Sequence, residues 1–401
     1  MNGAVTTMGQ TQTQLYDTVS RNSLLGPLAN DWEAIDLWLA HLRLRPVSDA
    51  TLKSYTSELA KLRWYCEVLQ HPHPSRWFLQ DAIQFVKWLQ EEAKLHVSTP
   101  KIAKSSPEWT PFKSVPSKAS IATTLKVANA LFKFWKSAGY IPANPLEKLG
   151  SQADKRPAKI RSIDPALIQS VITHMECSVG TAPTDFLLMV RNRFILLLLE
   201  HSGLRANEAI QADMDDIESV TDPKTQHMYW RLRVRFSKGG AETWVLLDDV
   251  VMDHLRIYRL AFGLPEMPAG HENIGLILST RTKAITRPNG ASVRYSAKAM
   301  RRMRQWQPIR RRQTLWDIIK GEFRKTADSM VAKGYVPEAQ RIEMASTHWL
   351  RHTFGTRLVR EGYDLRLVAQ LMRHKNIRNT MRYTEQEFLD VARQVADTAN
   401  P

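Results

Sequence analysis

Apolar residues in the first third of the chain recur at the three- and four-residue spacing of amphipathic helices. Four helices are predicted in this way, over about 35–44, 48–65, 79–93 and 120–135. On the third helix, Ile83, Val86 and Leu89 are expected to face inward. A His-Pro-His-Pro run and Gly139 interrupt the pattern. Residues 29–150 are therefore predicted to form an all-helical domain.

The second part of the chain mixes the helical period with strict alternation. Residues 186–202 form a long apolar run, which predicts a core helix, and Gly203 ends it. Apolar and polar residues alternate between 216 and 248, which predicts strands, and Ser237-Lys-Gly-Gly supplies a tight hairpin turn. Further helices are predicted from Pro165 and over 249–262, 314–334, 348–362, 365–372 and 385–396. The predicted fold class is mainly α with a small β-sheet.

Composition places the borders of these regions. Residues 1–28 are rich in Thr, Gln, Asn and Ser and are expected to be a flexible arm. Residues 151–161, SQADKRPAKIR, are polar and basic with one proline, as expected of a linker between domains. The second domain is then predicted over residues 162–401.

The net charge of +16 is the feature of the composition that bears most directly on function. A basic surface of that size suits a polyanion, most simply nucleic acid, although a merely soluble basic protein stays possible. The two cysteines lie far apart in apolar contexts and predict reduced core residues rather than a disulfide or a metal site. The longest apolar run, Phe194–Leu199, is too short to cross a bilayer, so a soluble, cytoplasmic protein is expected.

Basic residues are concentrated in two places. Residues 281–312 hold eleven Lys or Arg and no Asp or Glu. We interpret this stretch as a DNA-contacting insertion, with a disordered basic loop as the competing interpretation. In the helical domain, exposed lysines would form one wall of a DNA clamp or merely a solvated basic face. The candidate DNA contacts are Lys53, Lys126, Arg301, Arg302, Arg310 and Arg311.

Candidate chemistry lies in the last fifth of the chain. His348 and Arg351 are three residues apart and share one face of a helix. There, Arg351 can grip a phosphate with its planar fork while His348 donates beside it. His374 follows a second helix, and nine residues later comes the phenol of Tyr383.

Three segments together resemble the boxes of the tyrosine recombinases, the phage integrase family: HSGLRANEAI, HWLRHTFGT and LMRHKNIRNTMRYT. The resemblance implies that Arg205 is the first arginine of the site and Glu208 its supporting acid. Without the other boxes, this pair would be an ordinary surface pair of residues three apart. It further implies that His348, Arg351 and His374 surround the scissile phosphate, with Tyr383 as nucleophile.

Two positions depart from the pattern of the family. The family keeps a catalytic lysine on a β-hairpin, and Lys238 at the predicted hairpin tip is the candidate, but Ala241 and Thr243 replace the basic residues that often follow it. An exposed turn lysine is the alternative. Arg373 stands where a glycine usually precedes the histidine, so either the turn is reshaped or a phosphate contact is added. Tyr363 is a rival phenol, but it precedes His374 and so breaks the order of the family.

The resemblance also implies an activity and partners. The helical domain would be a SAM-like core-binding domain, and residues 162–401 the catalytic domain, with its last helix docked on a neighbouring subunit or on its own domain. The protein would cut and rejoin double-stranded DNA through a 3′-phosphotyrosine, without metal or nucleotide cofactor. It would act as a homotetramer on two sites, near the bacterial nucleoid, for a mobile element. An accessory DNA-bending or helper protein is a further candidate partner. The alternatives are a type IB topoisomerase-like nicking enzyme and a non-catalytic DNA-binding protein on the same scaffold.

Overall fold

The computed structural model describes residues 23–98, 102–103, 105–149, 161–235, 242–280, 285–286, 292–293, 306–374 and 376–381. The chain divides into two compact units, Met1–Arg156 and Pro157–Pro401. Within the described residues most of the backbone is helical and the sheets are small, which confirms the predicted fold class.

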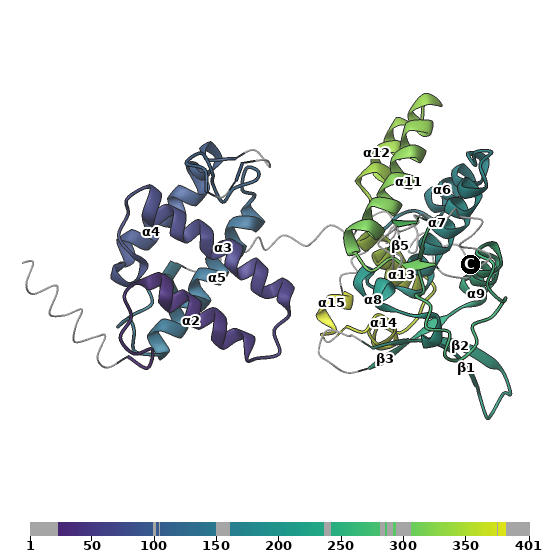
Figure 1. The fold of residues 1–401 in the computed structure, drawn as a ribbon, viewed down its shortest axis with the longest axis horizontal. Helices are drawn as coiled ribbons and strands as arrows, with labels where there is room; N and C mark the ends of the chain where they lie inside the picture. The colour runs from purple at the N-terminus through teal and green to yellow at the C-terminus, as the bar shows by residue number, and fades with distance from the viewer. Residues whose placement is uncertain are drawn as a thin grey trace, which may run out of the picture. The chain divides into compact units, whose positions relative to one another are not determined.

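The first unit contains the four predicted helices. They are α2 (Asp31–Arg43), α3 (Asp49–Val68), α4 (Leu79–Glu91) and α5 (Lys118–Ser137), with short 3-10 helices at Pro74–Arg76, Ala93–Leu95 and Glu147–Leu149. Side chains cap three of these helices, because Asn30, Ser48 and Ser117 each accept a hydrogen bond from a first-turn N–H group. Figure 1 shows the four helices packed around one another.

Aromatic side chains fill the core of this unit. Tyr65 lies fully inside, with ring centroids 4.9 Å from Trp88 and 5.0 Å from Phe85. The expectation for the third helix was wrong at Ile83, which is 36% exposed, because the buried face of α4 is centred on Phe85 and Trp88. Because the apolar face of a helix is wide, the 3.6-residue period alone does not determine which residues lie at its edge.

The second unit is built on longer helices. Its helices are α6 (Pro165–Cys177), α7 (Pro183–Ser202), α8 (Ala206–Gln211), α9 (Asp249–Ala261), α11 (Arg312–Ala332), α12 (Val336–Met344), α13 (Thr347–Arg360), α14 (Leu365–Leu371) and α15 (Arg378–Met381). A 3-10 helix at Met214–Asp216 leads into the main sheet. Of these helices, α12 and α15 were not predicted; α12 is antiparallel to α11 and has Pro337 in its first turn (Figure 1).

The main sheet is antiparallel, in the order β1 (Ile217–Thr221), β2 (Met228–Val234) and β3 (Thr243–Leu247). Leu232 pairs with Ile217 on one side and with Val245 on the other, and all three face the core. Residues that lie opposite one another in the sheet thus share its buried face, as the two-residue alternation of apolar and polar residues predicts. Two further pairs are short: β4 (Leu278–Ser279) with β7 (Gln307–Pro308), and β5 (Ile285–Thr286) with β6 (Ser292–Val293).

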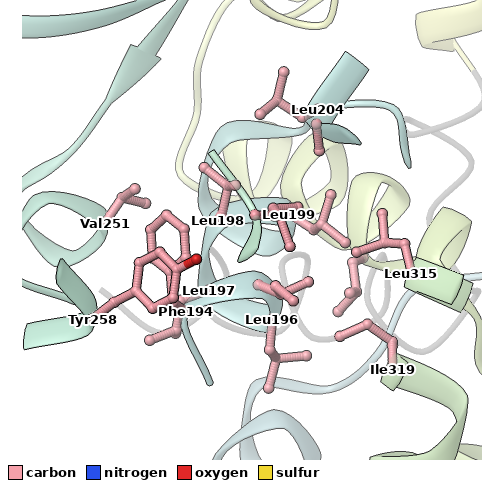
Figure 2. Close-up of a cluster of buried hydrophobic side chains, with 14 of the residues drawn as sticks. Phe194, Leu196, Leu197, Leu198, Leu199, Leu204, Val251, Tyr258, Leu315 and Ile319 are labelled. Atoms are coloured by element: carbon pink, nitrogen blue, oxygen red, sulfur yellow. The ribbon is translucent and has the colours of Figure 1, made fainter. Parts of the chain in front are cut away.

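Helix α7 is the centre of the second unit. Figure 2 shows its apolar side chains between α9, which contributes Val251 and Tyr258, and α11, which contributes Leu315 and Ile319. The ring of Phe194 stacks on that of Tyr258, with centroids 4.8 Å apart. The run Phe194–Leu199 of α7 is buried on every side, as the long apolar run predicts.

The basic stretch 281–312 ends inside the core. Trp306 is buried, and its indole N–H donates to the carbonyl of Phe262 at 2.8 Å. Ile309 is also buried, and Arg310 donates to the carbonyls of Ile210 and Ala212. The last residues of the expected insertion therefore belong to the domain core.

Among the described residues, no helix is both long enough and apolar enough to span a bilayer.

Candidate active site

The candidate site is organised around the turn after α7. Gly203 closes α7 with φ 59° and ψ 25°, a left-handed conformation that suits glycine. A Cβ at this position would lie 2.4 Å from Cδ1 of Phe354 on α13, so the turn and α13 are in close contact. The carbonyl of Gly203 accepts hydrogen bonds from Arg351 and Arg373. The turn thus joins three segments that are far apart in the sequence.

Arg205 begins helix α8 two residues after this turn. Glu208 accepts from the backbone N–H of Arg205 at 2.8 Å and from its Nη1 at 2.6 Å. The Arg205 side chain keeps 35% of its surface exposed, whereas that of Glu208 keeps 3%. The carboxylate is therefore an internal support, and the guanidinium retains a face for a ligand.

Arg351 lies on α13 and is almost fully buried. Its Nη1 donates to the carbonyl of Gly203 and its Nη2 to that of Met372, at the end of α14. Arg205 donates at 3.3 Å to the next carbonyl along the chain, that of Arg373. The two predicted site arginines thus bind consecutive carbonyls of one turn, so the structure brings them together.

The third predicted box lies at this same turn. His374 follows Arg373 directly, and its Nδ1 lies 2.9 Å from the hydroxyl of Thr380. A small apolar cluster made by Phe354, Leu358, Val368 and Met372 packs α14 against α13. His374 is thereby positioned by the fold beside the two arginines.

His348 lies at the start of α13, one turn before Arg351, and is exposed. Its ring makes an edge contact with that of His352, with centroids 4.4 Å apart. His352 is buried, so it packs within the protein beside His348. One helical turn between His348 and Arg351 places both on the same side of α13, as the spacing predicts.

The electrostatics of the site favour a charged Glu208. Burial by itself would raise the pKa of this carboxyl group, but the Arg373 cation and the hydrogen bonds from Arg205 outweigh burial and hold the pKa below its usual range. One carboxylate therefore faces two guanidinium groups. With Arg351 beside them, the described part of the site carries a net positive charge, which suits an anionic ligand.

A second ionic cluster lies at the end of α7, next to the Gly203 turn. His201, near the end of α7, hydrogen-bonds Asp248 at 2.6 Å and pairs with Glu200 at 2.8 Å. Burial opposes protonation of His201, but the hydrogen bonds to Asp248 and Glu200 prevail and raise its pKa to about 9. Arg357 of α13 also pairs with Glu200, at 3.2 Å. His201 thus joins Asp248 and Glu200 next to the turn.

Two predicted catalytic residues, Lys238 and Tyr383, lie outside the described residues. The strands β2 and β3 on either side of Lys238 are described, and they pair as a hairpin requires. The roles of both residues stay predictions.

The candidate DNA contacts have different surroundings. Lys53, Lys126 and Arg311 are exposed, whereas Arg301 and Arg302 lie outside the described residues. Arg310 is turned toward Asp213, with which it forms an ion pair, so its guanidinium already has a partner within the protein. Lys61, another lysine of the helical domain, is buried and pairs with Glu58 at 2.6 Å, so it is not part of an exposed basic face.

Comparison with known proteins agrees with this geometry. Residues 293–389 match the model of the phage integrase family. Over this segment the chain is similar to the phage integrase family. The match covers the segment that contains His348, Arg351, His374 and Tyr383.

Relatives of this family extend the likeness upstream. The tyrosine recombinase XerD of Mycobacterium tuberculosis (strain CDC 1551) is 25% identical over 236 residues, which are 58% of this chain and 60% of the relative. The XerD protein of Oceanobacillus iheyensis is 25% identical over 356 residues, 88% of this chain and 93% of the relative. The chain thus spans about three fifths of the length of the first relative and nearly all of the second.

Solved structures share the fold. The XerH site-specific recombinase bound to palindromic difH substrate, in a post-cleavage complex, aligns with a TM-score of 0.55 and 14% identity over 86% of this chain and 79% of that chain. A lambda integrase dimer bound to a COC′ core site also gives a TM-score of 0.55 and 14% identity, over 94% and 82% of the two chains. At such identities the likeness shows the fold alone.

Proposed function

We propose that this protein is a site-specific DNA recombinase that cuts and rejoins DNA through a 3′-phosphotyrosyl intermediate on Tyr383. The observation that carries the proposal is the convergence of Arg205, Arg351 and His374 at the turn Met372–Arg373, where consecutive carbonyls bind the two guanidinium groups. A pair of arginines held in this way can bind two oxygens of one phosphate group.

The chemistry follows from the charge of a phosphodiester. Its negative oxygens repel nucleophiles, and its alkoxide leaving group is poor, so catalysis requires positioning and charge neutralisation. Arg205 and Arg351 would bind the nonbridging oxygens, with His348 and His374 donating beside them. These donors are fixed by the fold before DNA binds, which lowers the reorganisation needed in the transition state.

Tyr383 would act as the nucleophile. Its phenol has an ordinary pKa of ~10, and the positive site would favour the phenolate. The phenolate oxygen forms a bond to phosphorus while the bond from phosphorus to the 5′ oxygen breaks, and Lys238 would give that oxygen a proton. Attack by the 5′-hydroxyl of a second DNA strand on the phosphotyrosine would reverse the step and join new ends.

The decisive experiment uses duplexes from the DNA that flanks the gene, each carrying a nick near the cleavage site so that the short 5′ fragment diffuses away. The full chain is expected to accumulate a covalent adduct that resists denaturant, and Tyr383→Phe is expected to lose it. Tyr363→Phe is the matched control, because Tyr363 is an exposed phenol on the same unit, and it should keep the adduct. DNA binding without any adduct would refute the proposal and favour a non-catalytic DNA-binding protein.

Exchange between two DNA sites separates a recombinase from a topoisomerase-like nicking enzyme. Two labelled duplexes with the same site should yield recombinant products, whereas a nicking enzyme would only relax supercoiled DNA. A lambda integrase tetramer bound to a Holliday junction shares this fold, with a TM-score of 0.54 and 13% identity over 94% of this chain and 82% of that chain. We therefore expect a tetramer on two sites, and the sequence of the flanking DNA should show whether a mobile element is served.

A further inference from the structure

Arg373 is an unusual residue for its backbone position. Helix α14 ends in a turn in which the N–H groups of Arg373 and His374 donate to the carbonyls of Gln370 and Ala369, both at 2.9 Å. Arg373 has φ 52°, in the left-handed region that disfavours residues with a Cβ. A strained position of this kind persists only when its surroundings hold it.

The side chain supplies the contacts that hold it. Arg373 is 7% exposed at its side chain, and its Nη2 lies 2.8 Å from Glu208 and 3.3 Å from the carbonyl of Gly203. Its Nη1 donates at 3.1 Å to the carbonyl of Leu371. The guanidinium thus points into the protein, toward the carboxylate that also holds Arg205.

Burial lowers the pKa of Arg373, and Glu208 opposes that shift. A buried guanidinium is stable only with a charged partner, and Glu208 likewise requires its cations. Arg373 therefore links the turn that presents His374 to the segment that presents Arg205, across 165 residues of sequence.

We propose that Arg373 is a positioning residue of the site: its buried ion pair with Glu208 holds Arg205 and His374 in register, and its side chain does not bind the DNA phosphate. This inference rests on the proposed function. Arg373 then acts through Glu208 and Arg205 and does not contact the reacting atoms.

The first test separates positioning from phosphate contact. A lost phosphate contact would weaken DNA binding and lower its salt slope by about one. Loss of a positioning contact would leave the salt slope unchanged, because Arg205 keeps its charge, and would slow single-turnover formation of the covalent adduct by at least ~10-fold, because breaking a buried ion pair disturbs both partners. Arg373→Met is expected to show the second result. Arg366→Met, on an exposed residue of the same helix, is the matched control and should keep the wild-type rate.

The second test separates the side chain from the backbone. Arg373→Gly removes the backbone strain, because glycine accepts φ 52° freely. If the turn alone mattered, this variant would match or exceed the wild-type rate, and the proposal would be wrong. If the ion pair positions the site, Arg373→Gly should slow adduct formation as much as Arg373→Met does. Arg373→Lys, which keeps the charge but not the planar guanidinium, should slow it less.

The third test is a double-mutant cycle. Arg373→Met leaves Glu208 buried with fewer cations, so adding Glu208→Gln should restore part of the adduct rate, at least ~5-fold, as expected for coupled buried partners. Additive losses would overturn the proposal. If Arg373→Met unfolds, the same cycle is read in the midpoint of thermal unfolding, where recovery in the double variant supports the ion pair and no recovery refutes it.

The two proposals fail differently. Absence of an adduct with the wild-type chain refutes the proposed chemistry. The anchor is then judged by the unfolding cycle alone, which needs no DNA. An adduct with the wild type and an unchanged rate in Arg373→Met refutes only the anchor.

Discussion

Replacement of Gly203 by alanine tests the turn on which the two site arginines converge. The glycine has φ 59°, and a Cβ there would lie 2.4 Å from Cδ1 and 2.9 Å from Cε1 of Phe354. Both atoms belong to a buried ring on α13, the helix that carries Arg351. The substitution therefore strains the backbone and separates two packed segments at once.

The magnitude follows from these two effects. An L-residue in the left-handed region costs about 1–2 kcal/mol, and the reduced entropy of the unfolded chain offsets about 0.4–1 kcal/mol of it. Overpacking against the Phe354 ring adds about 1–3 kcal/mol. We expect Gly203→Ala to lower the free energy of unfolding by about 1–5 kcal/mol, as the sum of these effects.

Gly362→Ala is the matched control. Gly362 has φ 84°, in the same region, but nothing lies within 4 Å of an added Cβ. It should show only the net backbone cost, about 1 kcal/mol or less. Urea unfolding of the full chain, followed by hydrogen exchange in peptides from α7 and α13, measures both variants.

Equal destabilisation by the two alanines would refute the reasoning, because the contact with Phe354 would then contribute nothing. A compensating variant adds a further check. Phe354→Leu shortens the side chain toward Gly203, so the losses from Gly203→Ala and Phe354→Leu should be less than additive.

Two further predictions concern buried polar groups of the second unit. Hydrogen bonds to Asp248 and Glu200 raise the pKa of His201 to about 9. Its contribution to stability is therefore complete below pH ~6.5 and is lost as the pH rises through about 9. His201→Gln should remove this pH dependence, on the order of 3 kcal/mol, in urea unfolding measured from pH 6 to 10, and an unchanged profile would contradict the assignment. The hydroxyl of the fully buried Tyr258 accepts a hydrogen bond from the N–H of Leu278 at 2.8 Å. Tyr258→Phe should therefore lower the free energy of unfolding by about 1–3 kcal/mol and speed hydrogen exchange at that N–H. Unchanged protection of the Leu278 N–H would argue against the bond.

The sequence by itself determined most of the elements and pointed to three residues of the candidate site that the structure brings together. Helix and strand periods are local, so they placed α2 to α7, the hairpin strands and α13 within a few residues of their observed ends. The convergence of Arg205, Arg351 and His374 was expected only because three ordered boxes resembled one family, and the structure brings these residues to one turn.

Tertiary structure alone decided which charges are internal. Lys61, Arg310 and Arg373 look like surface cations in the sequence, yet each is paired with an acid within the protein. The acids that pair with Arg310 and Arg373 lie 97 and 165 residues away.

The physical reason is that a local period reports which face of an element is apolar, but not what packs against that face. Trp306 and Ile309 end a strongly basic stretch, and only their contacts with distant segments show that they belong to the core. Likewise, the residues next to Arg373 and Glu208 in the sequence do not predict that either side chain is buried. The two form a buried ion pair only because α14 packs against the turn after α7.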